Sequence, residues 1–124
     1  MPRNKPLTDQ EIIRYTAAVP FFRGVFMRDT LPKRPWKREA GVVNLDNDSG
    51  PGTHWVAYKK NGSVVIYFDS FGDLRPPLEL EMYFNNCRIQ YNHDQFQTFN
   101  TSNCGQLCIQ FLYDQQLNFQ LKHV

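Results

Sequence analysis

The sequence has few cysteines and little net charge, and each of these shortages excludes a class of protein. Its 124 residues include three cysteines, an odd number without clustered pairs, which is not the pattern of a secreted disulfide framework. A formal net charge of +2 is too small to indicate a nucleic-acid-binding protein by itself. No stretch is long and apolar enough to span a membrane, and the N-terminus lacks the apolar core of a signal peptide. We therefore expect a soluble protein of a reducing, intracellular compartment.

Repeats and low-complexity segments are also missing, whereas apolar and aromatic residues are plentiful. Hydrophobic residues make up 41% of the chain and aromatic residues 15%, which suits one compact domain over residues 1–124. A domain of this size buries about two-thirds of its unfolded surface, so it can fold without a metal or a disulfide. We expect a monomer that requires no cofactor.

The dipeptide Asn61-Gly62 lies between two apolar-rich runs and predicts a β-hairpin with strands over 53–60 and 63–69. A two-residue loop at this dipeptide would place Lys60 opposite Ser63. Both faces of the two strands are mostly apolar, which is typical of central strands covered on both sides.

Counted outward from that loop, His54 falls opposite Asp69, on the same face of the hairpin. Direct cross-strand neighbours have Cβ atoms roughly 4.5–5.5 Å apart. The hairpin therefore predicts that a carboxylate holds an imidazole at one end of the two strands.

The remaining pattern predicts further helices and strands around this hairpin. A capping box at Thr8 and Glu11 opens a helix that Pro20 stops, and Pro77 stands near the start of a second helix. The other expected segments are an extended or turning segment at 21–26, an exposed loop at 30–40, strands at 41–45 and 87–91, a turn cluster at 46–52, and helices at 77–85 and 105–118. The fold class is α+β, with a small mixed central sheet and helices packed on it.

Cys104 directly precedes the third expected helix, where free amides and the helix dipole favour a negative charge. Cysteine attacks as the thiolate, and its pKa falls at such a position or beside a histidinium. Gly105, the next residue, lets the backbone approach a substrate closely. A nucleophile also needs a base and a group that orients the base, and His54 and Asp69 fit these roles.

The attacked carbonyl needs donors where its negative charge develops, and losing one such donor costs roughly 10²–10³ in rate. The Cys104 amide is one candidate donor. A side-chain amide from the preceding loop is the other, and Gln95 and Gln97 are both available there.

Four short motifs follow one another along the chain: His54-Trp55, Phe68-Asp69-Ser70-Phe71-Gly72, Gln97 and Asn103-Cys104-Gly105. Their order and spacing resemble the adenovirus-protease (adenain) type of cysteine peptidase, whose clan includes the ubiquitin-like-protein proteases. The similarity runs from Pro20 to Leu112 and includes Pro20-Phe21-Phe22-Arg23-Gly24 and Val43-Asn44. No single motif is specific, but their order and spacing together favour this family.

The resemblance implies a papain-like fold with the nucleophile at the start of a helix. It implies His54 as base, Asp69 as its orienting acid, Cys104 as nucleophile, Gln97 as oxyanion donor, and Trp55 packed near the site. The adenovirus enzymes have glutamate where this chain has Asp69, but aspartate is usual in the ubiquitin-like branch. Few residues follow Cys104, whereas relatives usually continue with more helices. We therefore expect either a minimal cysteine protease domain or a site that is loose or depends on a partner.

By the same resemblance, the substrate is a precursor polypeptide of a virus or virus-like element, cleaved near glycine, in a host nucleus or a virion. A cysteine near the position of Cys87 joins an activating peptide by a disulfide in the adenovirus branch, although a simple strand cysteine is the other interpretation. DNA also stimulates the adenovirus enzyme. The basic residues around Pro35-Trp36 therefore form either a solvated loop, a DNA contact or a nuclear-import signal; these residues are Lys33, Arg34, Lys37 and Arg38.

Three other interpretations compete with the endopeptidase. A deubiquitinase or deSUMOylase would need a surface groove for a folded partner, and a degenerate domain would bind peptide or DNA without catalysis. A zinc site at Cys104, Cys108 and His93 is disfavoured, because C-x₃-C lacks the usual ligand spacing and a clear fourth ligand. We expect no metal.

Overall fold

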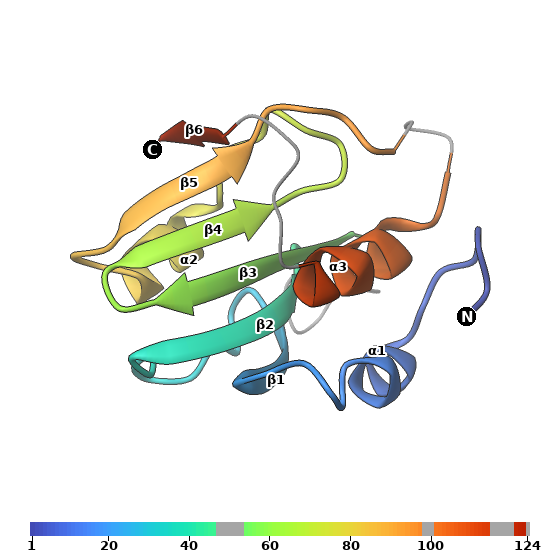
Figure 1. Ribbon diagram of the computed structural model, residues 1–124, viewed down its shortest axis with the longest axis horizontal. Coiled ribbons are helices and arrows are strands. Elements are labelled where there is room, and N and C mark those ends of the chain that lie inside the picture. Colours follow the sequence, from blue (N-terminus) through green and yellow to red (C-terminus); the bar gives the residue numbers. More distant parts are fainter. Residues whose placement is uncertain (47–53, 98–100, 115–120, 124) are drawn as a thin grey trace.

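A mixed β-sheet runs through the middle of the molecule, with helices on both of its faces (Figure 1). The computed structural model describes residues 1–46, 54–97, 101–114 and 121–123. Its strands are β1 (Phe22–Met27), β2 (Arg38–Asn44), β3 (Trp55–Asn61), β4 (Val64–Phe68), β5 (Arg88–Asn92) and β6 (Leu121–His123), and its helices are α1 (Asp9–Tyr15), α2 (Leu78–Tyr83) and α3 (Cys104–Tyr113). None of the helices in these ranges is long and apolar enough to cross a membrane.

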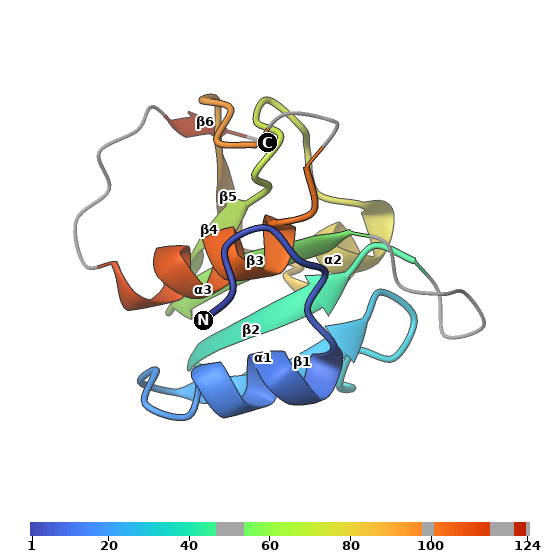
Figure 2. The same cartoon turned by 90° about the vertical axis from the view of Figure 1, so that its right-hand side faces the viewer.

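The strands lie in the order in which they occur in the chain, β1-β2-β3-β4-β5-β6. β1 pairs with β2 and β4 pairs with β5 in parallel, whereas the other neighbouring strands are antiparallel. Helices α1 and α3 cover one face and α2 covers the other (Figures 1 and 2). The α+β class with a mixed central sheet is therefore confirmed.

The two faces of β3 and β4 carry two separate apolar clusters. Trp55 and Ala57 belong to the cluster under α1 and α3, whereas Val56 and Tyr58 belong to the cluster under α2. All four side chains are buried. The prediction that these strands are central and covered on both sides is correct.

The predicted hairpin register is wrong by two residues. Asn61 pairs with Val64, so the loop residues are Gly62 and Ser63 rather than Asn61 and Gly62. Gly62 has a φ of 64°, while Ser63 is not among the residues with positive φ, which is the pattern of a II′ turn with glycine first. Because the slip is two residues and not one, every side chain keeps its predicted face.

Helix α1 ends at Tyr15, several residues before the end at Pro20 that the sequence predicted. Its capping box forms as predicted, with the Glu11 amide donating to Thr8 Oγ1 and the Thr8 amide to the Glu11 carboxylate. The helix then stops at Tyr15, and its C-cap Thr16 donates both its amide and its hydroxyl to the Ile12 carbonyl.

Other boundaries also differ from the sequence expectations. Strand β2 begins at Arg38, inside the segment expected to be an exposed loop, because Arg38–Ala40 pairs with β3. The expected segment at 21–26 is strand β1, and α2 and β5 lie where they were predicted. Helix α3 ends at Tyr113, residues 115–118 of its predicted range lie outside the described residues, and so does most of the turn cluster at 46–52. Strand β6 was not predicted.

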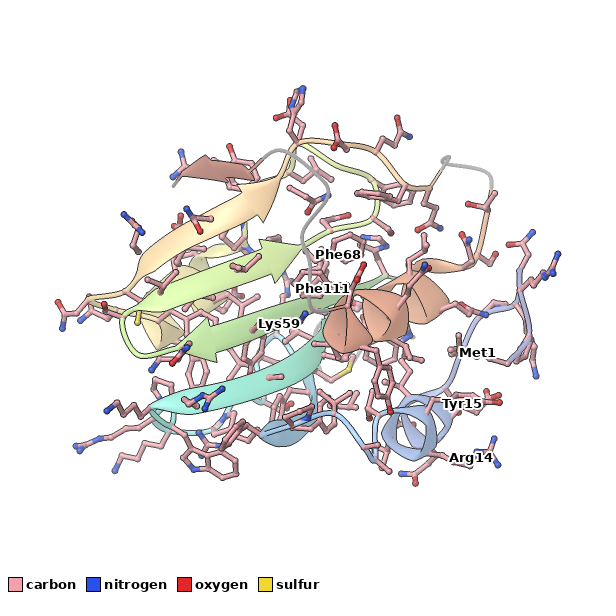
Figure 3. The ribbon with its side chains drawn as sticks, viewed as in Figure 1. Met1, Arg14, Tyr15, Lys59, Phe68 and Phe111 are labelled. Atoms are coloured by element: carbon pink, nitrogen blue, oxygen red, sulfur yellow. The ribbon has the colours of Figure 1, made fainter. Side chains whose placement is uncertain are left out.

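Helix α3 is anchored on the sheet through Phe111. Its ring stacks on Phe68 of β4 with centroids 4.9 Å apart, and Lys59 Nζ of β3 lies 4.6 Å from its centroid. Figure 3 shows these three side chains together where α3 crosses the sheet. This anchor fixes the far end of α3, and thereby the direction in which its first turn points.

Candidate active site

His54 and Asp69 meet at the end of the sheet where β3 begins and β4 ends. His54 Nε2 lies 2.9 Å from Asp69 Oδ1, and the Phe71 amide donates to the same oxygen at 3.0 Å. The two residues are not direct cross-strand partners, because in the observed register Asp69 lies diagonally across from His54. They still share a face, and the predicted pairing of their side chains is present.

Cys104 is the first residue of α3 and places its sulfur against the start of β3. The Trp55 amide donates to Cys104 Sγ at 3.5 Å, and His54 and the Gly105 amide lie near enough to the sulfur to lower the pKa of the thiol. Since Nε2 of the His54 imidazole hydrogen-bonds Asp69, Nδ1 is the ring nitrogen that remains to face the sulfur. The structure therefore brings His54, Asp69 and Cys104 together in one row.

The pKa values of this row favour a charged pair. Burial lowers the pKa of His54, but the hydrogen bonds and negative charges of Asp69 and Cys104 outweigh it and raise the pKa to about 9. Burial raises the pKa of Cys104, but the hydrogen bonds from His54 and the backbone amides, with the imidazolium charge, bring it below the usual thiol value. The arrangement favours a thiolate beside an imidazolium.

Two residues that sequence reasoning did not single out hold this row in place. The Asp69 amide donates to Asn92 Oδ1 at 2.9 Å, and Asn92 Nδ2 donates back to the Asp69 carbonyl at 2.7 Å. The Phe71 ring stacks on the His54 imidazole with centroids 4.6 Å apart and planes 15° apart. Phe71 lies inside a motif that carries the family resemblance, whereas no local pattern marks Asn92, whose partner lies 23 residues away.

Gln97 is buried and tied to the segment that leads into Cys104. Its Nε2 donates to the Thr101 carbonyl at 2.8 Å, and its Oε1 accepts from the Ser70 hydroxyl. The Gln97 amide also donates to the Ser70 carbonyl at 2.9 Å. The other loop candidate, Gln95, donates its side-chain amide to the Gln97 carbonyl and so supports this segment. The side chain thus joins the turn after Asp69 to the approach of the helix.

The N-terminal segment, residues 2–7, lies across the first turn of α3 (Figure 2). Gln106 Nε2 donates to the carbonyls of Pro2 and Lys5 at 3.0 and 2.7 Å. The indole of Trp55 donates to the Leu7 carbonyl at 3.0 Å. The predicted packing of Trp55 beside the site is thus observed, and its indole also anchors this segment.

The Cβ that an alanine would add at Gly105 would lie 3.2 Å from Leu7 Cβ and 3.4 Å from Trp55 Cδ1. A glycine here therefore allows the N-terminal segment and the nucleophile helix to approach closely. The sequence predicted that Gly105 allows a close approach of a substrate. In the structure, the groups that approach it closely are Leu7 and Trp55 of the same chain.

Cys87 and the basic residues lie away from this row. Cys87 is half-buried directly before β5, and because β4 and β5 are parallel it lies at the opposite end of the sheet from Asp69. The four basic residues are exposed, three of them between β1 and β2 and the fourth at the first position of β2; they are Lys33, Arg34, Lys37 and Arg38.

Cys108 is fully buried one turn after Cys104, and its thiol donates to the Trp55 carbonyl at 3.3 Å. Burial raises its pKa well above the usual value, which makes it a core thiol. His93 lies at the surface against Asp73. Among the described ranges, no group of three or more histidine, cysteine or acidic side chains is arranged to hold a metal ion.

The row of a thiol, an imidazole and a carboxylate can perform nucleophilic acyl transfer, since it supplies a nucleophile, a base and an orienting acid. Comparison with known proteins assigns no family to the chain, because no protein-family model and no curated protein matches its sequence.

Proposed function

We propose that the protein is a cysteine endopeptidase. The observation that carries the proposal is the single imidazole of His54, which hydrogen-bonds the Asp69 carboxylate and also interacts with the Cys104 thiol, the two together raising its pKa. This is the geometry of an activated thiol nucleophile with an oriented base. The family resemblance of the sequence supports the same assignment.

In the acylation step, the Cys104 thiolate attacks the carbonyl carbon of a peptide bond. The imidazolium of His54 gives its proton to the leaving nitrogen as the carbon–nitrogen bond breaks, so the products are a thioester and a free amine. Asp69 keeps the imidazole in the orientation that both transfers need. The amide of Cys104 and the side-chain amide of Gln97 are the donors proposed for the oxyanion.

In the deacylation step, neutral His54 takes a proton from water, and the resulting hydroxide attacks the thioester carbonyl. The carbon–sulfur bond breaks, the carboxylic acid leaves and Cys104 returns as the thiolate. The sum of both steps is hydrolysis of one peptide bond by one water molecule. No other reactant is required.

A small residue before the scissile bond fits the surroundings of the sulfur. Cys104 is only 6% exposed, and Trp55 and the stacked pair of His54 and Phe71 lie beside it. A large side chain next to the attacked carbonyl would meet these groups, whereas glycine would not. This supports the proposal that the enzyme cleaves near glycine, in precursor proteins of a virus or virus-like element.

A peptidyl electrophile with glycine next to its warhead tests the proposal, with labelling followed by intact mass. We expect one adduct on the wild type between pH 5 and 9 and none on Cys104→Ala, while His54→Ala reacts at least about 10²-fold more slowly. Cys87→Ser is the matched control and should label like the wild type. A folded wild-type protein that shows no labelling across this pH range would contradict the enzyme assignment and favour a non-catalytic binding domain.

The isopeptidase alternative is separated by a second probe, a ubiquitin or SUMO chain that ends in the same electrophile. Faster labelling by the folded probe than by the short peptide would assign a deubiquitinase-type activity. Equal or slower labelling favours the endopeptidase.

Activators are part of the proposal through the family resemblance alone. An activating peptide would reach the chain through a disulfide at Cys87, and DNA would contact the exposed basic residues Lys33, Arg34, Lys37 and Arg38. A DNA effect predicts faster labelling at low salt that disappears when all four are replaced by alanine.

A further inference from the structure

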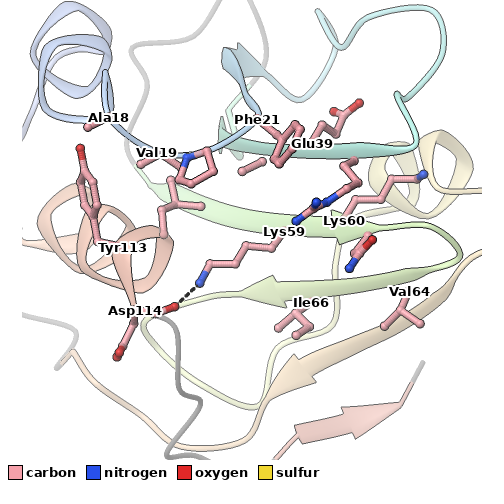
Figure 4. Close-up of a pocket in the computed structure, with 15 residues that line it drawn as sticks. Ala18, Val19, Phe21, Glu39, Lys59, Lys60, Val64, Ile66, Tyr113 and Asp114 are labelled. Carbon is pink, nitrogen blue, oxygen red and sulfur yellow. Dashed lines mark hydrogen bonds between the residues drawn. The ribbon is translucent and has the colours of Figure 1, made fainter.

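A cavity of about 600 Å³ opens on the α3 face of the sheet, at the end of β3 farthest from His54. Strands β2, β3 and β4, the turn before β1 and the last turn of α3 line it (Figure 4). Its volume lies within the range of small-ligand and peptide side-chain pockets. The ten residues of α3 separate it from Cys104 by about 15 Å at 1.5 Å per residue, so it is not part of the candidate active site.

The floor of the cavity is apolar. Val19, Ala40 and Leu112 are buried side chains that line it, and Ile66 and Val64 of β4 are half-buried in it. Such a floor suits an aliphatic or aromatic side chain and offers nothing to a bare phosphate.

Phe21 stands at the rim with 53% of its surface exposed, although it is a large apolar residue. Its φ of 57° lies in the left-handed region, a strained conformation for a non-glycine residue that is often found at ligand-binding sites. The guanidinium of Arg38 lies 4.2 Å from the ring centroid. The strained backbone therefore presents an aromatic ring and a cation together at the mouth of the cavity.

Two cations lie at the cavity, and neither of them forms a salt bridge with a carboxylate in the described part of the chain; they are Arg38 and Lys59. The ammonium of Lys60 is already engaged by the carbonyls of Trp36 and Lys37. Lys59 extends across the floor and donates to the Asp114 carbonyl (Figure 4), with its charge partly compensated by the Asp114 carboxylate. Burial nevertheless lowers the pKa of Lys59.

The buried carboxylate in the wall, Glu39, is already engaged. Its oxygens take hydrogen bonds from Arg23, the Trp36 amide and the hydroxyls of Tyr58 and Tyr83. It is therefore not available to neutralise Arg38 and Lys59.

We propose that this cavity is a docking site for an acidic peptide segment, in which carboxylates meet Arg38 and Lys59 while a neighbouring aliphatic or aromatic side chain fills the apolar floor. The charge of the rim selects the carboxylates and the floor selects a peptide rather than a nucleic acid. The site is independent of the proposed peptidase chemistry. A polypeptide held here would lie on the same face as α3, one helix length from the sulfur.

The probe is the tetrapeptide acetyl-Glu-Phe-Glu-Leu, with acetyl-Gln-Phe-Gln-Leu as its uncharged counterpart, titrated into the ¹⁵N-labelled protein. We expect the acidic peptide to shift the amide resonances of β2, β3 and β4 that line the cavity. Its glutamine counterpart should bind at least about tenfold more weakly, because it cannot form hydrogen bonds between charged groups with Arg38 and Lys59.

Matched substitutions locate the site. Lys59→Gln and Arg38→Gln should each weaken binding of the acidic peptide about tenfold, while Lys33→Gln and Arg34→Gln, which remove the same charges outside the cavity, should leave it unchanged. The amide spectrum of each variant reports whether it is folded, and Ile66→Ala, which removes the floor and no charge, gives a second test by also weakening binding.

Three results would overturn the proposal: equal binding of the two peptides, no shift of the cavity amides at millimolar acidic peptide, or shifts at the same residues with a short DNA duplex but not with the peptide. None of these results bears on Cys104 labelling. The peptidase assignment and the docking site therefore stand or fall separately.

Discussion

Asn92 holds Asp69 by a reciprocal pair of hydrogen bonds. The Asp69 amide donates to the Asn92 side-chain oxygen, and the Asn92 side-chain nitrogen donates to the Asp69 carbonyl. A third bond, from Asn92 Nδ2 to the Asp94 carbonyl at 3.0 Å, fixes the side chain. Because Asn92 is 1% exposed, none of these bonds is replaced by water when the side chain is removed. The orientation of the acid in the candidate active site thus depends on a side chain of β5.

We expect Asn92→Ala to destabilise the fold by about 1–3 kcal/mol, as measured by urea denaturation, because it leaves buried backbone groups of Asp69 unpaired. At temperatures where the variant is folded, labelling of Cys104 should be slower and its alkaline limb should move to lower pH, since Asp69 no longer holds His54 firmly. Asn85→Ala, at an exposed asparagine, is the control. A purely structural role would change stability and leave the pH profile where it is.

The pH dependence of Cys104 labelling should be bell-shaped. The pKa of His54 is raised from 6.5 to about 9, so its protonated form is complete below 6.5 and is lost as the pH rises through about 9. The pKa of Cys104 is lowered below that of an ordinary thiol. Its thiolate is therefore complete at a pH above the ordinary thiol pKa and is lost only as the pH falls through the lowered pKa. The alkaline limb of the labelling rate should therefore lie near pH 9.

The interactions that set the pKa of His54 also predict the effect of Asp69→Asn. The variant loses the carboxylate that raises the pKa of His54, so the alkaline limb should move to lower pH and the rate should fall by about 10²-fold or more. His93→Gln removes an exposed histidine at the surface and should change neither quantity. An unshifted limb in Asp69→Asn would show that the carboxylate does not tune the imidazole.

The three cysteines should differ in reactivity toward a small alkylating agent. The hydrogen bonds and the imidazolium charge that favour the Cys104 thiolate have no counterpart at Cys108, whose pKa burial raises well above the usual value. At pH 6 we expect iodoacetamide to modify Cys104 first, as located by peptide mass spectrometry, and the His54→Ala variant to lose this preference. Faster modification of Cys87 than of Cys104 in the wild type would contradict the charged pair.

Gly72 should tolerate substitution far less than Gly62, although both have a positive φ. An alanine Cβ at Gly72 would lie 2.5 Å from the Asp94 carbonyl oxygen, whereas at Gly62 it would meet nothing within 4 Å. We expect Gly62→Ala to cost about 1 kcal/mol from its backbone conformation alone, and Gly72→Ala to cost more than about 2 kcal/mol. Thermal and urea unfolding of the two variants checks the difference, and equal losses would contradict the close approach.

Gln106 should control how firmly the N-terminal segment is held. Gln106→Ala removes two hydrogen bonds to that segment and should cost about 1–3 kcal/mol, with faster amide exchange over residues 3–7. Gln110→Ala, at an exposed position of the same helix, is the matched control. Unchanged exchange in Gln106→Ala would mean that the segment is held by Leu7 and Trp55 alone.

Local patterns in the sequence were enough for most elements and for the residues of the row. Alternation fixes which face a strand residue lies on, so the His54 and Asp69 side chains meet even though the predicted loop was wrong by two residues. The helix start at Cys104 follows from the apolar spacing after it. The catalytic roles of these residues stay predictions that the labelling experiments test.

What the sequence did not indicate depends on contacts between distant segments. Asn92 lies in β5 and meets Asp69 only because β5 pairs with β4, and the N-terminal segment meets α3 across about a hundred residues. Helix α1 ends at Tyr15, ahead of Pro20, and a turn that the Val19 amide closes on the Thr16 carbonyl follows it. Strand β6 is too short to have a periodic pattern of its own.

The contact of residues 2–7 with the first turn of α3 has a consequence for the order of synthesis. A ribosome makes the N-terminal segment and strands β1 to β5 before it makes Cys104, and domains generally fold from the N-terminus during synthesis. The thiol would therefore be made only after the strands on which α3 packs. A nascent chain would stay inert toward its neighbours until α3 docks.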